Sequence, residues 1–199
     1  ERHPDYIQLA LGETSNAAGS TNFLIENNAF YCDFGYHQAI FLFNERTARG
    51  DDATTTLAAS GHNNGIIRGN YIESRHIHAI ALSGSLGCLI ERNLIRRRQP
   101  TSTPNGQNHD DPPQINLLPV TSNACRPTGI IRNNVQPARD NLGNNTIRLI
   151  TPGSSKSQLS SQTLMTVQDN VRSATAVPPN WATGDVALGK IGPYGYLVA

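Results

Sequence analysis

A short apolar motif, isoleucine–any residue–leucine, recurs along the chain at similar intervals. Alternate side chains of a β-strand face opposite sides, so the Ile and the Leu of each motif point one way and the residue between them points the other way. Recurring strands with one apolar face predict a repeat architecture whose copies bury that face together. The copies are Ile7-Gln8-Leu9, Ile40-Phe41-Leu42, Ile80-Ala81-Leu82, Ile115-Asn116-Leu117 and Ile147-Arg148-Leu149.

A second apolar segment lies between consecutive triplets and ends in asparagine. Each copy carries an inward Ile or Val, then a charged or polar residue, and Asn three positions after the Ile or Val. Because the two segment types alternate strictly, we expect one of each in every repeat, which we call a coil. The copies span 23–28, 65–70, 88–93, 129–134 and 165–170, with Ile25, Ile67, Ile90, Ile131 and Val167 expected to be buried.

The residue after each buried Ile or Val is expected to point outward; its charge alternates in sign over the first four copies, and the fifth copy has a neutral amide. If successive coils stack about 4.8 Å apart, opposite charges become neighbours, each pair contributing about 0.2–1 kcal/mol. The alternation therefore predicts parallel, in-register stacking independently of hydrophobicity. The expected exposed ladder consists of Glu26, Arg68, Glu91, Arg132 and Gln168.

The asparagines that end the second segments share one position of the repeat. Stacked asparagines bond side chain to side chain in amide ladders, and Asn also tolerates the left-handed backbone that a tight corner needs. A single such Asn would simply mark a turn, whereas repetition at one position favours a ladder. We expect this ladder to contain Asn28, Asn70, Asn93, Asn134 and Asn170.

The segments Ile-Ile-Arg-Gly-Asn-Tyr-Ile (66–72) and Leu-Ile-Glu-Arg-Asn-Leu-Ile (89–95) resemble strand repeats of the right-handed parallel β-helix of the pectate-lyase type. This resemblance implies an all-β solenoid of about five coils with loop inserts over residues 1–171, and we expect further coils before Glu1. Residues 172–199, which break the repeat, are expected to cap the open end. The family includes polysaccharide lyases, uronate epimerases, glycoside hydrolases and bacteriophage tailspike proteins.

Composition narrows the choice of partner. The 199 residues have a formal net charge of +1 and are 16% charged, which argues against nucleic acid as a partner. No apolar run approaches the roughly 18 residues that a membrane span needs, so no membrane span is expected. The 3 cysteines are scattered and form no metal motif, and we expect neither a metal nor a cofactor.

Histidines gather just before the triplet strands. Stacking would place them at one edge of consecutive coils, and although a single one is most simply a solvated turn residue, the group favours a functional cleft. Outward residues of the same strands, together with amides beside them, would extend a sugar platform from this edge. The histidines that precede triplets are His3, His37, His76, His78 and His109, leaving His62 outside the group.

A lyase or epimerase acting on an acidic polysaccharide must remove the C5 proton of a uronate. That step needs a base and cationic or hydrogen-bonding groups at the adjacent carboxylate, with Arg75 as the carboxylate clamp. A glycoside hydrolase needs two carboxylates about 5–9.5 Å apart. Asp5 and Asp111, three coils apart, would be separated by roughly 14 Å, whereas Asp5 and Asp33, one coil apart, could be close enough, so a hydrolase stays as the less favoured alternative to a lyase or epimerase. The candidate catalytic residues are His78, His76, Tyr36, Arg75, His37 and Asp5, and the candidate substrate-binding residues are Gln38, Phe41, Asp111, Gln114, Asn116 and Arg148.

The sequence therefore predicts two alternative functions from different classes. The first is a polysaccharide lyase or epimerase, with a polysaccharide as partner. The second is a structural or receptor-binding part of a phage tail, a homotrimer or a piece of a larger assembly that binds surface glycan without cleaving it. Either function places the protein outside the cell, at a cell surface or on a virion.

Overall fold

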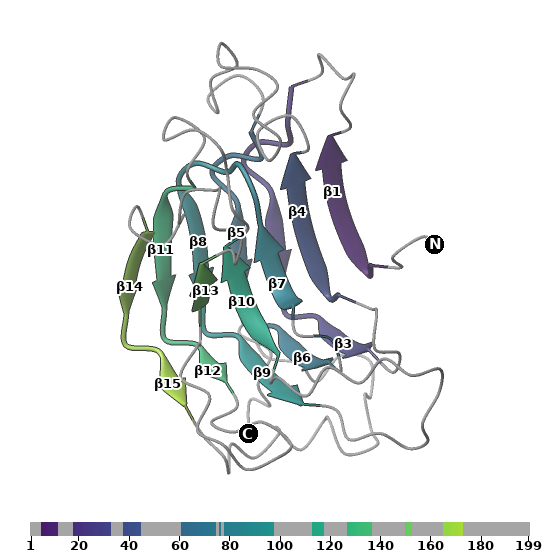
Figure 1. Cartoon of the computed structure of the whole chain (residues 1–199), viewed down its shortest axis with the longest axis vertical. Coiled ribbons are helices and arrows are strands. Elements are labelled where there is room, and N and C mark those ends of the chain that lie inside the picture. The colour runs from purple at the N-terminus through teal and green to yellow at the C-terminus, as the bar shows by residue number, and fades with distance from the viewer. Residues whose placement is uncertain are drawn as a thin grey trace.

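The computed structural model describes residues 5–11, 18–32, 38–44, 61–74, 76, 78–97, 113–117, 127–136, 150–152 and 165–172. All regular secondary structure within these ranges is β-strand (Figure 1). The described part of the chain contains no helix with the length and apolar character of a membrane span.

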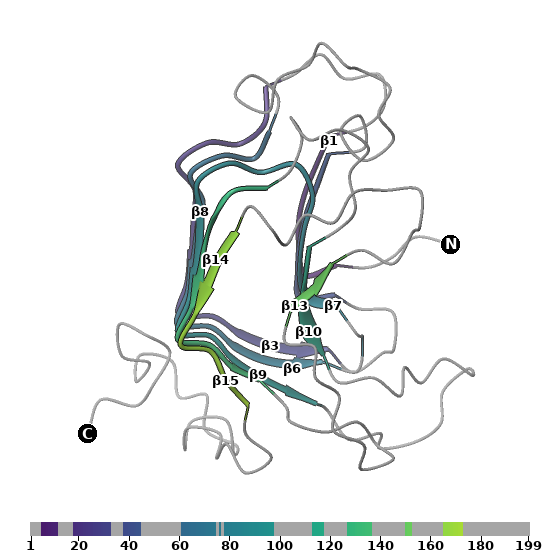
Figure 2. The ribbon, with the colours of Figure 1, turned by 60° about the vertical axis from the view of Figure 1, so that its left-hand side comes forward.

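The strands form three parallel sheets, each of which takes every third strand of the chain. Figure 2 shows the sheets on three sides of a common interior. This arrangement of stacked parallel sheets is compatible with a β-solenoid. The first sheet contains β1 (Ile7–Leu11), β4 (Ile40–Asn44), β7 (His78–Leu82), β10 (Gln114–Leu117) and β13 (Ile150–Pro152). The second contains β2 (Leu24–Glu26), β5 (Ile66–Arg68), β8 (Cys88–Glu91), β11 (Gly129–Arg132) and β14 (Met165–Gln168). The third contains β3 (Ala29–Cys32), β6 (Tyr71–Ser74), β9 (Leu94–Arg97), β12 (Val135–Gln136) and β15 (Val171–Arg172).

The first four Ile-x-Leu triplets stack in register within the first sheet, as predicted. Ile7 pairs with Ile40, Ile40 with Ile80, and the stack continues to Ile115. These isoleucines face the interior, and those of β4, β7 and β10 are fully buried. The leucines two positions later form a parallel stack beside them, consistent with strand alternation.

The register predicted for the last triplet was wrong. The strand that pairs with β10 is β13, with Ile150 opposite Ile115 and Thr151 opposite Asn116. Thr151 thus takes the place beside Asn116 that the pattern gave to Arg148, and the triplet 147–149 lies outside the described residues. The sequence offers two apolar starts three residues apart, and β13 lies at the end of its sheet, where a single neighbour fixes the register and a proline is tolerated.

The charged ladder of the second sheet is confirmed as a set of neighbours in register. Arg68 Nε lies 2.7 Å from Glu26 Oε2, and Arg132 Nε lies 2.9 Å from Glu91 Oε2. One part of the prediction was wrong, because the Glu91 side chain is only 6% exposed. Its position between Arg68 and Arg132 on the neighbouring strands is consistent with this low exposure.

The inward-facing residues of the second sheet are buried, except for the last one. Ile25, Ile67, Ile90 and Ile131 belong to the core. Val167, predicted to be buried with them, is 41% exposed. It lies in β14, the last strand of its sheet, which has a neighbouring strand on one side only. The end of the stack therefore leaves part of the apolar row uncovered by the described strands.

The asparagine ladder is confirmed. Side-chain nitrogens donate to the next Asn Oδ1 at 3.0 Å (Asn28 to Asn70), 2.9 Å (Asn70 to Asn93), 2.9 Å (Asn93 to Asn134) and 2.8 Å (Asn134 to Asn170). Each accepting Oδ1 also takes the backbone N–H of the preceding Asn. The ladder thus satisfies backbone and side-chain groups at the corner between the second and third sheets.

The left-handed backbone conformation falls one residue earlier than predicted. The residue before each ladder Asn has a positive φ, so the turn is made there and the Asn itself is left to bond along the stack. Because β-branched residues are poorly tolerated at positive φ, we expect this position to reject Val or Ile. The residues concerned are Asn27 (57°), Gly69 (61°), Arg92 (55°), Asn133 (55°) and Asp169 (53°).

The third sheet follows directly after this corner. The sequence pattern predicted only two strands per coil and did not distinguish this third strand from the second segment. Its inward residues, Phe30, Ile72 and Ile95, lie two positions after a ladder Asn and are buried. In the last two strands that position is occupied by Gln136 and Arg172. These polar residues interrupt the apolar repeat that would have predicted the third sheet. The predicted cap begins inside β15, and its residues after 172 lie outside the described ranges.

Candidate functional site

The turn between β6 and β7 is fixed by short-range hydrogen bonds that position two histidines. Ser74 Oγ accepts from the His76 backbone N–H at 3.0 Å and donates to the His76 carbonyl oxygen at 3.2 Å. His76 Nδ1 accepts from the His78 backbone N–H at 2.9 Å. An accepting Nδ1 places the proton of a neutral ring on Nε2. His76 is buried, with 5% of its surface exposed.

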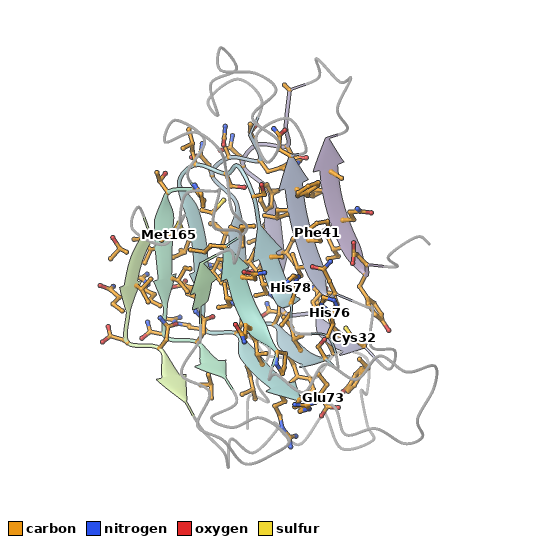
Figure 3. All side chains as sticks on the ribbon, in the orientation of Figure 1. Cys32, Phe41, Glu73, His76, His78 and Met165 are labelled. Atoms are coloured by element: carbon orange, nitrogen blue, oxygen red, sulfur yellow. The ribbon has the colours of Figure 1, made fainter. Side chains whose placement is uncertain are left out.

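His78 begins β7 at a register shift. It pairs with Gln114, whereas two positions on Ile80 pairs with Ile115, so Ala79 is an extra residue. A regular register would instead pair His78 with Pro113, which lies two residues before Ile115. The rings of His76 and His78 meet edge to face with centroids 4.9 Å apart, and they lie together near the start of β7 (Figure 3). The bulge re-aims His78 along the sheet, as bulges beside functional sites do.

The contact that this bulge allows is with the next strand of the sheet. Asn116 Nδ2 lies 2.6 Å from His78 Nε2. Asn116, predicted to bind substrate, therefore touches the candidate base directly. No signal in the sequence predicts this contact, because it depends on the register shift between β7 and β10.

Three side-chain amide oxygens near the start of the first sheet's strands are buried. Gln38 lies two positions before Ile40, as His78 does before Ile80, and Gln114 is the register partner of His78. Gln38, Gln114 and Asn116 are 5%, 4% and 5% exposed, and their side-chain oxygens have no hydrogen-bond donor. A buried acceptor without a donor costs about 1–3 kcal/mol, so these oxygens favour a place where ligand donors bind. We call His76, His78, Gln38, Gln114 and Asn116 the His78 cluster.

An aromatic pair lies on the neighbouring strand of the same sheet. Phe41 stacks on Phe43 with ring centroids 5.1 Å apart and an interplanar angle of 14°. Phe41 is the register neighbour of Gln8 and Ala81 and is half-buried (Figure 3). Asp5 has the same offset before Ile7, and its carboxylate oxygens are shielded from solvent.

The structure leaves five candidate site residues undescribed. Tyr36, His37, Arg75, Asp111 and Arg148 lie outside the described residues. The described candidates His78, His76, Gln114 and Asn116 come together, and Gln38 lies two residues before the adjacent strand β4. Within the described ranges, no three His, Cys, Asp or Glu side chains gather as a metal site requires.

A second polar cluster, which the sequence did not predict, lies on the third sheet. The Tyr71 hydroxyl donates to Glu73 Oε1, and Arg96 Nη1 lies 3.5 Å from the same carboxylate oxygen. Burial, followed by the Glu73 carboxylate, raises the pKa of Tyr71, and Arg96 opposes the shift only in part. Arg96 is engaged by Glu73, so the members of this cluster pair with one another.

Comparisons with protein-family models, with curated protein sequences and with solved structures found no match to this chain.

Proposed function

We propose that this chain is a right-handed parallel β-helix of the pectate-lyase type, with about five coils and a C-terminal cap. The strand order supports it, since neighbours in every sheet are three strands apart in the chain. A connection between parallel strands of one sheet is right-handed in about 98% of cases. The Asn ladder supports it further, because it ties each coil to the next at one corner.

We further propose that the protein acts on an acidic polysaccharide by lyase- or epimerase-type removal of the C5 proton. The observation that carries this proposal is the His78 cluster, in which the imidazole contacts the Asn116 amide and the buried side-chain oxygens of Gln38 and Gln114 have no donor. His78 is the base. The oxygens of Gln38 and Gln114 would accept hydrogen bonds from sugar hydroxyls, which are donors as well as acceptors.

The remaining roles follow from the chemistry of a uronate. Charge that develops on its carboxylate needs a cation or hydrogen-bond donors. Arg75, between Ser74 and His76 in the chain, is proposed as that cation, with Tyr36 and His37 as proton donors and Asp5 as an orienting carboxylate. The stacked pair Phe41 and Phe43 offers an aromatic surface for a sugar face. Such a substrate lies outside the cell, at a cell surface or on a virion, and we propose that location.

The test is a panel of acidic polysaccharides followed by the absorbance of unsaturated products and by analysis of uronate epimers. The parent protein is expected to alter at least one of them. His78→Ala is expected to lower turnover by about 10²–10⁴-fold, the usual contribution of a general base, and to leave polymer binding largely intact because the base acts on the transition state.

Gln168→Ala, which removes an exposed amide from the second sheet, is the matched control and should retain parent turnover. Full activity of His78→Ala would exclude His78 as the base. Binding of a glycan without any chemical change would favour the phage-tail function, in which the coil is structural or receptor-binding.

A further inference from the structure

His78 and Asn116 form a side-chain pair that spans two strands of the first sheet. The register shift at Ala79 places His78 opposite Gln114, and Asn116, two residues further along β10, reaches His78 Nε2 at 2.6 Å. Asn116 is 5% exposed and His78 is half-buried, so the contact is part-buried. A hydrogen bond to one ring nitrogen decides which nitrogen of a neutral imidazole carries the proton.

The orientation of the amide determines which nitrogen that is. With the amide nitrogen toward the ring, Nδ2 donates to Nε2 and the buried Oδ1 has no donor. Amide oxygen and nitrogen exchange places by a rotation of 180°. With the oxygen toward the ring, Oδ1 accepts from Nε2–H, and the 2.6 Å separation lies just below the 2.7–3.2 Å range of N–H···O bonds. The rotation gives the oxygen a donor and moves the amide nitrogen to the place that the oxygen held.

We infer that Asn116 Oδ1 accepts the Nε2–H bond of His78 and so keeps the lone pair of the neutral ring on Nδ1. Asn116 is then a positioning residue, not a residue that binds substrate. The inference rests on the proposed function in making His78 the base. In the proton transfer, Nδ1 takes the C5 proton, the electron pair of the C5–H bond moves into the carboxylate-stabilised carbanion, and the imidazolium keeps its bond to Asn116.

The tautomer is measured directly by long-range ¹H–¹⁵N correlation spectra of the labelled full chain, with His78→Asn used to assign the His78 signals. The parent protein is expected to show a neutral His78 protonated at Nε2. Asn116→Asp supplies acceptors only, so it should preserve this tautomer. Asn116→Ala should leave a mixture of tautomers, and on a substrate that the parent converts it should lower turnover by about 10–100-fold through loss of ring orientation.

The outcomes distinguish failure of the inference about Asn116 from failure of the proposed function. A parent His78 protonated at Nδ1, or loss of the Nε2–H form in Asn116→Asp, would overturn the inference, because either result means that the amide donates. A parent His78 protonated at Nε2 in a protein that alters no acidic glycan would leave the inference standing and remove the proposed function. Far-ultraviolet circular dichroism of each variant, with Gln168→Ala as control, verifies that the fold is retained.

Discussion

At the scale of single residues, the ladder asparagines show why one side chain type recurs at one position. Asn93 Oδ1 accepts from the backbone N–H and side chain of Asn70 at 3.1 and 2.9 Å. Its Nδ2 donates to the Ile67 carbonyl at 3.0 Å and to Asn134 Oδ1 at 2.9 Å. A carboxylate lacks the donors, and a hydroxyl lacks the two separate polar atoms, so only an amide makes all four bonds here.

Replacing Asn93 with alanine tests this account. The backbone N–H of Asn70 and the carbonyl of Ile67 would lose their bonds to Asn93 in a buried corner. At about 1–3 kcal/mol for each buried group left without a partner, Asn93→Ala should lower the free energy of unfolding by about 2–5 kcal/mol, measured by urea denaturation. Gln168→Ala, at an exposed position, should change it by less than about 0.5 kcal/mol. Equal effects of the two variants would contradict a stabilising ladder.

At the scale of the element, the second sheet is held by charges whose order along the stack matters. Glu91 lies between Arg68 and Arg132, and its carboxylate pairs with Arg132 while Arg68 pairs with Glu26. Exposed ion pairs contribute little. Glu91 is the exception because its side chain is buried, although Arg132 remains partly exposed to solvent.

Reversing the charge of Glu91 should therefore destabilise the sheet. Glu91→Lys loses a charged hydrogen bond and places a third cation in the row, so we expect the free energy of unfolding to fall by about 1–3 kcal/mol. Adding Arg132→Glu restores an attractive pair and should recover part of that loss, measured as a coupling energy in a double-mutant cycle by urea denaturation. A coupling energy of zero would mean that the alternation of charge along the row is accidental.

At the scale of the whole molecule, stability depends on proton binding by a histidine outside the site. His62 is 2% exposed, and its Nδ1 accepts from the Ser20 backbone N–H at 3.2 Å. Burial lowers the pKa of His62 below 6.5, and the backbone of Phe43 opposes this shift only in part. The folded state therefore holds His62 neutral, whereas the unfolded chain protonates it near its ordinary pKa.

The sign of the pH dependence follows from linkage. As the pH falls below about 6.5, the unfolded state binds more protons than the folded state, so stability decreases. Above that pH the contribution of His62 is fully present. Urea unfolding at several pH values between about 7 and 5 should show the parent losing stability, and His62→Asn, whose Oδ1 keeps an acceptor for Ser20, should lose less. An equal loss in both proteins would contradict a role for His62.

The sequence by itself determined the repeat. Ile-x-Leu triplets, alternating charges and ladder asparagines depend on side-chain periodicity, which strand geometry fixes before any contact forms. The stacks through Ile40, Ile80 and Ile115 and the bonds from Asn28 to Asn170 followed from it. Periodicity also placed His76 and His78 at one edge of the first sheet.

The tertiary structure decided what periodicity leaves free. The register of β13 was set by pairing at the end of a sheet, where Ile150 and not Ile147 meets Ile115. The bulge at Ala79 brought His78 to Asn116, and the neighbours of Glu91 on adjacent strands were consistent with its burial. These features depend on contacts between residues far apart in the chain. Such contacts form only when the strands are stacked, so the local sequence does not determine them.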